Sequence, residues 1–438
     1  MLRPGRCAWQ RPNGTEDDVS AGSGHQGGVR PSTTVPAVAP FPGRSVTAAV
    51  VVVAAVLTTV VALANPYRRS PDVNPTLTGP AWLDGWFHYD AGWYLQIATE
   101  GYDYVPGQQS SIAFFPVYPL TVRALGTVLG DTQVAGTLLG ALAGLATALV
   151  FGRWAWDRLP RRAAMFAVAV LLVYPYAMFL YGAIYADSLF MLCTIGAFLL
   201  LDRRWFVAAG VVGALATAGR PVGTAVLVGL VVRTLEILAE DRRAAAGLVG
   251  SVEPGPGRVG WRELVGAVRD VRPRQLGVLL SGLGLAAWSG YLWLAFGDPL
   301  AFVHVESAPG WDQGVGPHTW FKLGYVELIQ DGHYRTAALL TVQALACVVA
   351  VLLLPRVWRL FGWGYLAYAV VVLLIPIVGT DDFMGTGRYA LAAFPVVAAA
   401  GHFVAGLRSR VLAGGLLALS ATLLLALTVM FGISFEVS

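Results

Sequence analysis

The chain has 438 residues, of which 56% are hydrophobic and only 13% are charged, and its formal net charge is +4. A single soluble core stops growing at roughly 250–300 residues, so this composition over this length excludes one soluble globular domain. The three cysteines, Cys7, Cys193 and Cys347, show neither CxxC nor Cys/His spacing, and they favour neither a disulfide framework nor a zinc site. The arginines follow the connections between apolar segments instead of forming one patch, which argues against nucleic-acid binding.

Residues 1–43 are rich in Gly, Pro, Ser and Thr and have no apolar periodicity. This composition predicts a disordered tail. The first apolar run begins near Ser45, which is too late for a signal peptide. We therefore expect two regions, a cytoplasmic tail over 1–43 and a transmembrane domain over 44–438.

Apolar stretches recur from residue 45 to residue 432, and about 20 such residues cross ~30 Å of hydrocarbon. Arginine-rich connections alternate with connections that are poor in cations. Eleven spans place every arginine-rich connection in the cytoplasm together with the N-terminus, and they leave the C-terminus outside. The spans are predicted at about 45–65, 133–152, 163–180, 186–201, 205–219, 222–238, 276–296, 337–354, 360–378, 389–405 and 411–432.

The segment FFPVYPLTVRALGTVLG, residues 114–130, is apolar enough for a twelfth span. A crossing there would move the basic segment RWAWDRLPRR to the outside, against the distribution of arginines. The sequence therefore predicts a re-entrant or interfacial helix, with Pro116 and Pro119 shaping its entry.

The connections between the spans include three long ones, two outward (66–132 and 297–336) and one cytoplasmic (239–275). Long outward loops on a compact bundle are more often functional than decorative. The cytoplasmic loop contains GLVGSVEPGPGRVG, a flexible linker by composition, with neither a Walker A pattern nor GxGxxG. The sequence therefore predicts function in the outward loops and no nucleotide site.

The first outward loop holds WLDGWFHYDAGWYLQIATEGYDY, in which Asp90 precedes an amphipathic run with Trp93 and Tyr94. Such a run is expected to lie at the outer membrane surface. An acid among aromatic rings there is partly desolvated, and we expect its pKa to rise towards that of a general base. Alternatively, Asp90 caps the helix over 91–99 and the rings form an interfacial belt.

Three further charged residues lie at outward ends of spans: Asp187, Arg220 and Arg388. Asp187 either caps its helix or faces the same vestibule as Asp90. A guanidinium in this position binds a planar oxyanion such as phosphate or pairs with an acid. The adjacent acids Asp381 and Asp382 would neutralise Arg388 or attract a divalent cation, although two neighbouring aspartates are weak evidence for a metal.

Acids, arginines and aromatic rings are thus predicted to gather on the outer face, where nucleotides are absent. A group transfer there needs a donor that has already been translocated, and the apolar body suits a lipid-linked one. In this hypothesis Arg220 and Arg388 hold the donor phosphate while Asp90 activates an acceptor hydroxyl.

The run HYDAGWYLQIATEGY followed by AFFPVYPL resembles the signature of the PIG-V-like mannosyltransferases, polytopic enzymes of the GT-C class. The resemblance continues through YPYAMFLYGAIYADSLF, ATAGRPVG, GDPLAFVH and GRYALAAFP, over roughly residues 82–396. It implies an all-α, GT-C-like bundle whose large first outward loop carries interfacial helices and the essential aspartate, which matches Asp90. Where eukaryotic relatives have a Glu after the tyrosine of the second motif, this chain has Asp187.

The resemblance implies transfer of mannose from polyprenyl-phosphate-mannose to a glycolipid or glycan on the non-cytoplasmic face, with inversion in one displacement. Asp90 takes the acceptor proton, and Arg220 or Arg388 stabilises the departing phosphate. We expect no metal and no other cofactor. The residues expected to bind substrate are His88, Trp93, Tyr94, Tyr185, Asp187 and His304.

Two other functions fit a polytopic chain. A transporter or flippase of a lipid-linked glycan needs polar residues at mid-depth in several spans. These spans are nearly free of them, which disfavours transport. A non-catalytic scaffold for envelope assembly would leave Asp90 dispensable.

Overall fold

The structure is a computed structural model that describes residues 40–68, 77–246, 259–314 and 316–437. The described residues from Phe41 onward belong to one unit, and Met1–Pro40 is divided from it. Most of the predicted tail and of the Gly-rich cytoplasmic linker lies outside the described residues. The unit from Phe41 onward holds every helix that the structure describes.

Within the described residues this unit is helical, without strands, which confirms the predicted all-α class. Short 3-10 helices flank the longer ones, and those that contribute to the site or to its packing are η2 (Ala81–Trp86), η3 (Ser111–Ala113), η4 (Ala177–Leu180), η5 (Pro221–Gly223), η7 (Gln275–Gly282) and η8 (Val305–Ser307). The α-helices are α1 (Gly43–Ala64), α2 (Asp90–Thr99), α3 (Val117–Leu129), α4 (Thr132–Trp156), α5 (Arg161–Val173), α6 (Asp187–Asp202), α7 (Phe206–Thr217), α8 (Thr224–Ala245), α9 (Trp261–Gly266), α10 (Leu283–Phe296), α11 (Ala301–His304), α12 (Pro317–Trp320), α13 (Leu323–Gln330), α14 (Tyr334–Phe361), α15 (Trp363–Gly379), α16 (Thr386–Ala392), α17 (Phe394–Ala405) and α18 (Arg410–Gly432).

Helices occupy all eleven predicted positions, but the number of eleven spans is not confirmed. Six described helices are long and apolar enough to cross a membrane, or seven if the bent pair α16–α17 is one span. That pair bends by 81° where Pro395 enters the first turn of α17, because proline clashes with the preceding turn. Helix α3, with 13 residues, reaches about 20 Å at 1.5 Å per residue and is shorter than a span.

Small residues let the helices approach closely, as in other membrane bundles. A Cβ atom on Gly210 of α7 would lie 2.0 Å from the carbonyl oxygen of Gly277 in η7. A Cβ atom on Gly401 of α17 would lie 2.3 Å from the backbone of Ala167 in α5. Larger side chains at these two glycines would push the helices apart.

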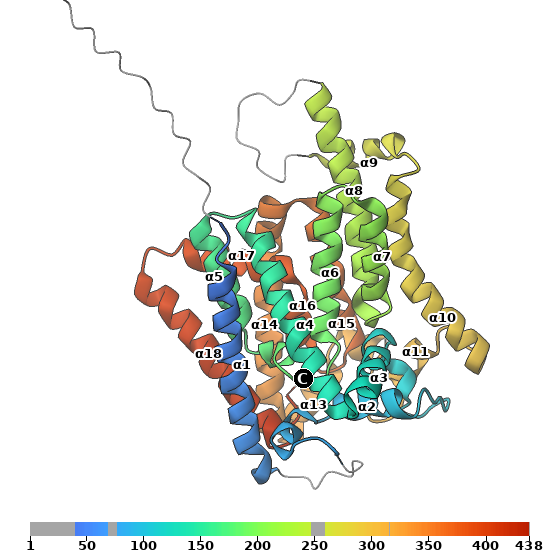
Figure 1. Cartoon of the computed structure of the whole chain (residues 1–438), viewed down its shortest axis with the longest axis vertical. Helices are drawn as coiled ribbons and strands as arrows, with labels where there is room; N and C mark the ends of the chain where they lie inside the picture. Colours follow the sequence, from blue (N-terminus) through green and yellow to red (C-terminus); the bar gives the residue numbers. More distant parts are fainter. Residues whose placement is uncertain (1–39, 69–76, 247–258, 315, 438) are drawn as a thin grey trace, which may run out of the picture. The chain divides into compact units, whose positions relative to one another are not determined.

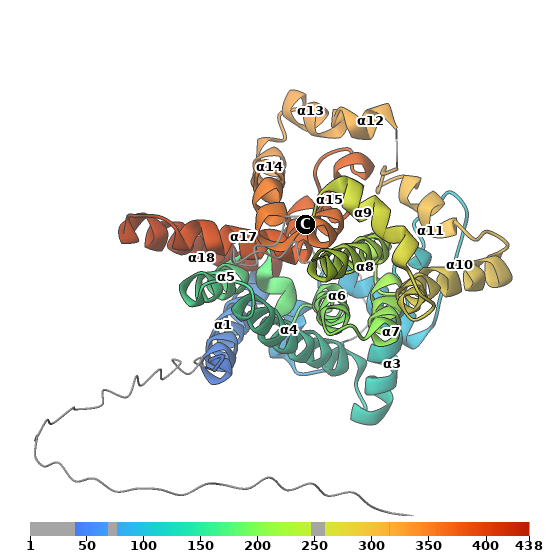
Figure 2. The same ribbon diagram turned by 90° about the horizontal axis from the view of Figure 1, so that it is seen from above.

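The two ends of the bundle carry different helices and ion pairs. At one end, which carries α9, Asp202 accepts hydrogen bonds from Arg158, Arg233 and Tyr365, and Arg242 pairs with Asp270. The opposite end carries α2, α3, α11 and α13 (Figure 1). Figure 2 shows the chain's C-terminal end among the helices instead of at the edge of the bundle. Val437 there is only 2% exposed.

Candidate active site

Asp90 is the first residue of α2, and its carboxylate faces an arginine. Tyr89 just before it has φ +55°, a left-handed conformation that is uncommon for a residue with a side chain. The Asp90 amide donates to Tyr185 Oη at 3.2 Å, and this hydroxyl donates to the carbonyl of His88 at 3.2 Å. The N-cap residue of α2 is Tyr89, and Asp90 is the first residue inside the helix. The Asp90 Oδ2 accepts a hydrogen bond of 3.0 Å from Arg388 Nη1, so the capping alternative is wrong.

Arg388 lies on the short helix α16 and contacts two acids, Asp90 and Asp187. The turn before this helix has Gly385 at φ +76°, a conformation that glycine adopts without steric cost. The Arg388 Nε lies 3.9 Å from Asp187 Oδ1, while Nη1 bonds Asp90. The guanidinium lies over the rings of Phe179 and Tyr185, 5.2 Å from each centroid. It is therefore held by charge and by aromatic faces together.

Arg220 and Asp187 form a second, more deeply buried pair. Their side chains are 6% and 3% exposed, and Arg220 Nη1 donates to Asp187 Oδ1. Pro221 follows Arg220 and opens η5 between α7 and α8. The Arg220 guanidinium also lies 4.8 Å from the centroid of the Tyr389 ring. Of the two roles left open for Arg220, the structure shows the ion pair, and the N-cap residue of α6 is Ala186 instead of Asp187.

Aromatic residues from α2 connect this cluster of two aspartates and two arginines (the charged cluster) to the outward loops. The Tyr94 ring packs against Tyr185 and Phe114, with centroids 6.2 and 5.1 Å apart. Trp93 stacks on Phe114 at 5.8 Å and meets Trp311 edge-on at 5.8 Å. Both predicted α2 aromatics are thus held by packing, and Tyr94 lies next to the Asp90 end of the cluster.

The two histidines predicted to bind substrate lie in different surroundings. His88 is 3% exposed, and its Nδ1 is 3.2 Å from Ser434 Oγ. His304 Nδ1 is 2.7 Å from Asp298 Oδ2, and the His304 side chain is 59% exposed. The structure thus brings His88 next to the charged cluster, and it pairs His304 with a loop acid instead. The substrate role of His304 stays a prediction.

The adjacent acids Asp381 and Asp382 do not neutralise Arg388, which pairs with Asp90. Asp382 accepts from the Met384 amide at 2.8 Å, and burial raises the pKa of both aspartates. Within the described ranges no group of three or more His, Cys, Asp or Glu side chains is placed to hold a metal ion. Independence from metals stays a prediction.

Sequence reasoning missed the C-terminal segment. Besides the contact between Ser434 and His88, the Val437 carbonyl accepts from Gln343 Nε2 at 3.1 Å. The Gln343 Oε1 in turn accepts from the Gly387 amide at 3.4 Å. The segment is therefore tied near both partners of the Arg388–Asp90 pair. No local pattern in the sequence indicates where a chain end docks.

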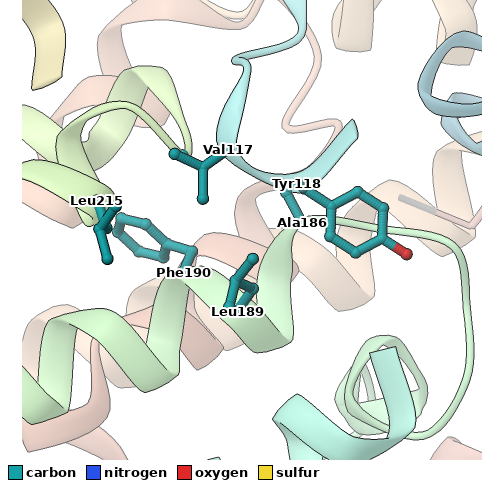
Figure 3. Close-up of a pocket in the computed structure, with 7 residues that line it drawn as sticks. Val117, Tyr118, Ala186, Leu189, Phe190 and Leu215 are labelled. Carbon is teal, nitrogen blue, oxygen red and sulfur yellow. The ribbon is translucent and has the colours of Figure 1, made fainter. Parts of the chain in front are cut away.

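A small apolar pocket lies beside the charged cluster. Its empty space of about 170 Å³ includes open solvent, and it leaves no room for a water molecule. Figure 3 shows that α3, α6 and α7 line it, with the Phe190 ring directed towards Leu215. Two lining residues, Ala186 and Gly219, directly precede Asp187 and Arg220 in the chain. Apolar surface and buried arginine thus meet at one place.

Fold and site define a multi-pass, all-helical membrane protein with a buried cluster of acids and arginines, as expected for a membrane glycosyltransferase. Residues 49–241, somewhat less than half of the chain, match the family model described as mannosyltransferase (PIG-V). The match includes Asp90, Asp187 and Arg220. This part of the chain, which holds three of the four charged residues of the cluster, is thus similar to that family.

Solved structures with a partly similar fold include ArnT from Cupriavidus metallidurans bound to undecaprenyl phosphate. It is 16% identical with a TM-score of 0.46, over 89% of this chain and 76% of that one. The archaeal oligosaccharyltransferase AglB from Archaeoglobus fulgidus, in complex with an inhibitory peptide and a dolichol-phosphate, is 13% identical with a TM-score of 0.45. That match covers 91% of this chain and 57% of AglB. No curated protein sequence matches the chain.

Proposed function

We propose that this protein is a membrane mannosyltransferase that transfers mannose from a polyprenyl-phosphate-mannose donor to a glycolipid or glycan acceptor, with inversion, and that Asp90 is the base. The observation that carries the proposal is the hydrogen bond between Arg388 and Asp90. In this pair a proton-accepting carboxylate lies beside a cation that suits phosphate.

In one displacement, the acceptor oxygen attacks C1 of the mannose and its proton passes to the Asp90 carboxylate. The bond from C1 to the phosphate oxygen breaks, and its electron pair stays on the phosphate. The neutral carboxyl then holds Arg388 less strongly than the anion did. Arg388 is therefore released towards the phosphate as negative charge builds there.

Arg220 supports the donor phosphate from the other side of the cluster. The charged cluster is neutral in sum, with two carboxylates and two guanidinium groups. A bound phosphate competes with Asp187 for Arg220, and a buried arginine offers two parallel donors for this exchange.

We assign the reaction to the extracytoplasmic face. The end of the bundle opposite the charged cluster carries Arg158, Arg233 and Arg242. Arginine-rich connections favour the cytoplasmic side. The N-terminus is then cytoplasmic, and the donor reaches the site from the outer leaflet.

The test measures sugar transfer by protein in membranes, with polyprenyl-phosphate-mannose or GDP-mannose as donor and an envelope-lipid extract as acceptor. We expect product from the lipid donor only, and a loss of about 100-fold or more in Asp90→Asn. An Asp84→Asn variant, in η2 of the same loop, is the control. Transfer from GDP-mannose, or full activity of Asp90→Asn, would contradict the proposal.

A further inference from the structure

Glu306 lies in a loop segment that covers the end of the site formed by α2. It belongs to η8, which packs against η3. Trp311, five residues later, meets Trp93 and Phe114 edge-on, with centroids 5.8 and 6.1 Å apart. Trp93 lies one helical turn after Asp90, so the two share a face of α2. These contacts place the Glu306 segment over the face that carries Asp90.

The Glu306 carboxylate differs from the two acids of the charged cluster. It is partly buried, and it makes no hydrogen bond or ion pair within the part of the chain that the structure describes. Asp90 and Asp187 each contact an arginine. Burial first, and then the negative charge of Asp90, raise the pKa of Glu306 to about 7.

Other charged groups surround this segment, but Asp90 is the one that acts on Glu306. In η3, the Ser111 hydroxyl donates a hydrogen bond to the Asp103 carboxylate. Upstream in the loop, His304 contacts Asp298. Glu436, on the C-terminal segment, also faces Asp90. Burial first, and then the charges of Asp90 and Asp382, raise the pKa of Glu436. The ionisable groups to consider are therefore Asp90, Asp103, Asp298, His304, Asp312 and Glu436.

We propose that Glu306 receives, directly or through one water, the proton that Asp90 has taken from the acceptor hydroxyl. This inference rests on the proposed function. Passage of the proton restores the Asp90 carboxylate and its bond to Arg388, and the partly exposed Glu306 then releases the proton to water. A carboxyl group that titrates near the working pH can perform both transfers. Without it, we expect the return of Asp90 to its anionic form to slow turnover.

The test compares one turnover, with enzyme in excess over donor, and steady-state turnover in Glu306→Gln. We expect a single-turnover rate within about twofold of wild type, because Asp90 accepts the first proton unaided. We expect steady-state turnover to fall roughly tenfold or more. Imidazole should restore it by carrying the proton. Glu327→Gln, an exposed acid of the same outward loop, should behave as wild type in both measurements.

Three outcomes would overturn the inference. Equal losses in both measurements without rescue by imidazole would mean that Glu306 binds substrate. Unchanged steady-state turnover would mean that the proton leaves by another route. The selective loss in Glu436→Gln instead of Glu306→Gln would assign the role to the C-terminal segment. A failure of the proposed function can be told apart from a failure of this inference, because Asp90→Asn would then keep the single-turnover rate of wild type.

Discussion

Arg388 donates a hydrogen bond of 3.0 Å to Asp90, joining two residues that lie 298 positions apart in the chain. Arg388 lies at the start of the tenth predicted span, whereas Asp90 lies in the first outward loop. Protonation of Asp90 weakens its hydrogen bond to Arg388, so the charge of the Asp90 carboxylate decides how strongly Arg388 is held. This coupling should therefore be visible in the kinetics of variants at either residue.

Arg388→Lys should lower kcat about tenfold or more, because lysine keeps the charge but loses the planar fork that serves Asp90 and the phosphate. In the double variant with Asp90→Asn the two losses should not add, since both residues act in one step. Steady-state transfer by the two single variants and the double variant checks this. Additive losses would show that the two side chains act independently.

Arg220→Lys should raise the KM for the lipid donor and leave the KM for the acceptor largely unchanged, because the bidentate geometry is lost on the donor side only. Initial rates with each substrate varied in turn measure the two values. Arg204→Lys, whose arginine pairs with Asp241 at an exposed position, is the matched control. Equal losses on both substrates would identify the Arg220–Asp187 pair as purely structural.

Arg220→Ala should destabilise the protein by roughly 3 kcal/mol, because removing one partner leaves Asp187 buried without its main counterion. Thermal unfolding in detergent should show a clearly lowered Tm. The double variant Arg220→Ala/Asp187→Ala should recover part of the loss, since it removes the uncompensated charge. A double variant less stable than Arg220→Ala would refute this account.

Gln343→Leu should lower turnover and stability, because it leaves the Gly387 amide and the Val437 carbonyl without their buried partner, at a cost of about 1–3 kcal/mol. Ser434→Ala should also lower turnover, because it removes the contact that fixes His88, two residues before Asp90. Ser420→Ala is the control, because Ser420 bonds Val173 away from these contacts. Equal effects of the two serine variants on turnover would show that docking of the C-terminal segment does not affect the site.

Glu306 should make stability depend on pH in a definite direction. Its pKa is about 7 in the folded protein and 4.5 as the ordinary value, so the folded state binds more protons between these values. Stability then falls as pH rises from about 4.5 to about 7. Glu306→Gln should therefore have a higher Tm than wild type at pH 8, with little difference at pH 4.5. A Tm difference that is the same at both pH values would mean that Glu306 titrates normally.

The sequence by itself determined the helices and several of the charged residues. Long apolar runs impose helices in a membrane because every backbone group must be satisfied within its own segment. The first outward loop identified Asp90, and the outward ends of the apolar runs identified Asp187, Arg220 and Arg388. The number of spans was less predictable, because a bend at Pro395 divides one apolar run and because helices such as α7 and α15 are shorter than a full span.

Only the tertiary structure decided which charge meets which. Hydropathy and spacing act over a few turns of helix, whereas the pairing of Asp90 with Arg388, and of Asp187 with Arg220, depends on how distant helices pack. The same holds for Glu306 and for the C-terminal segment beside His88, neither of which carries a local signal. Helix formation is a local property of the sequence, while a buried site is assembled from groups that burial and charge bring together only in the folded chain.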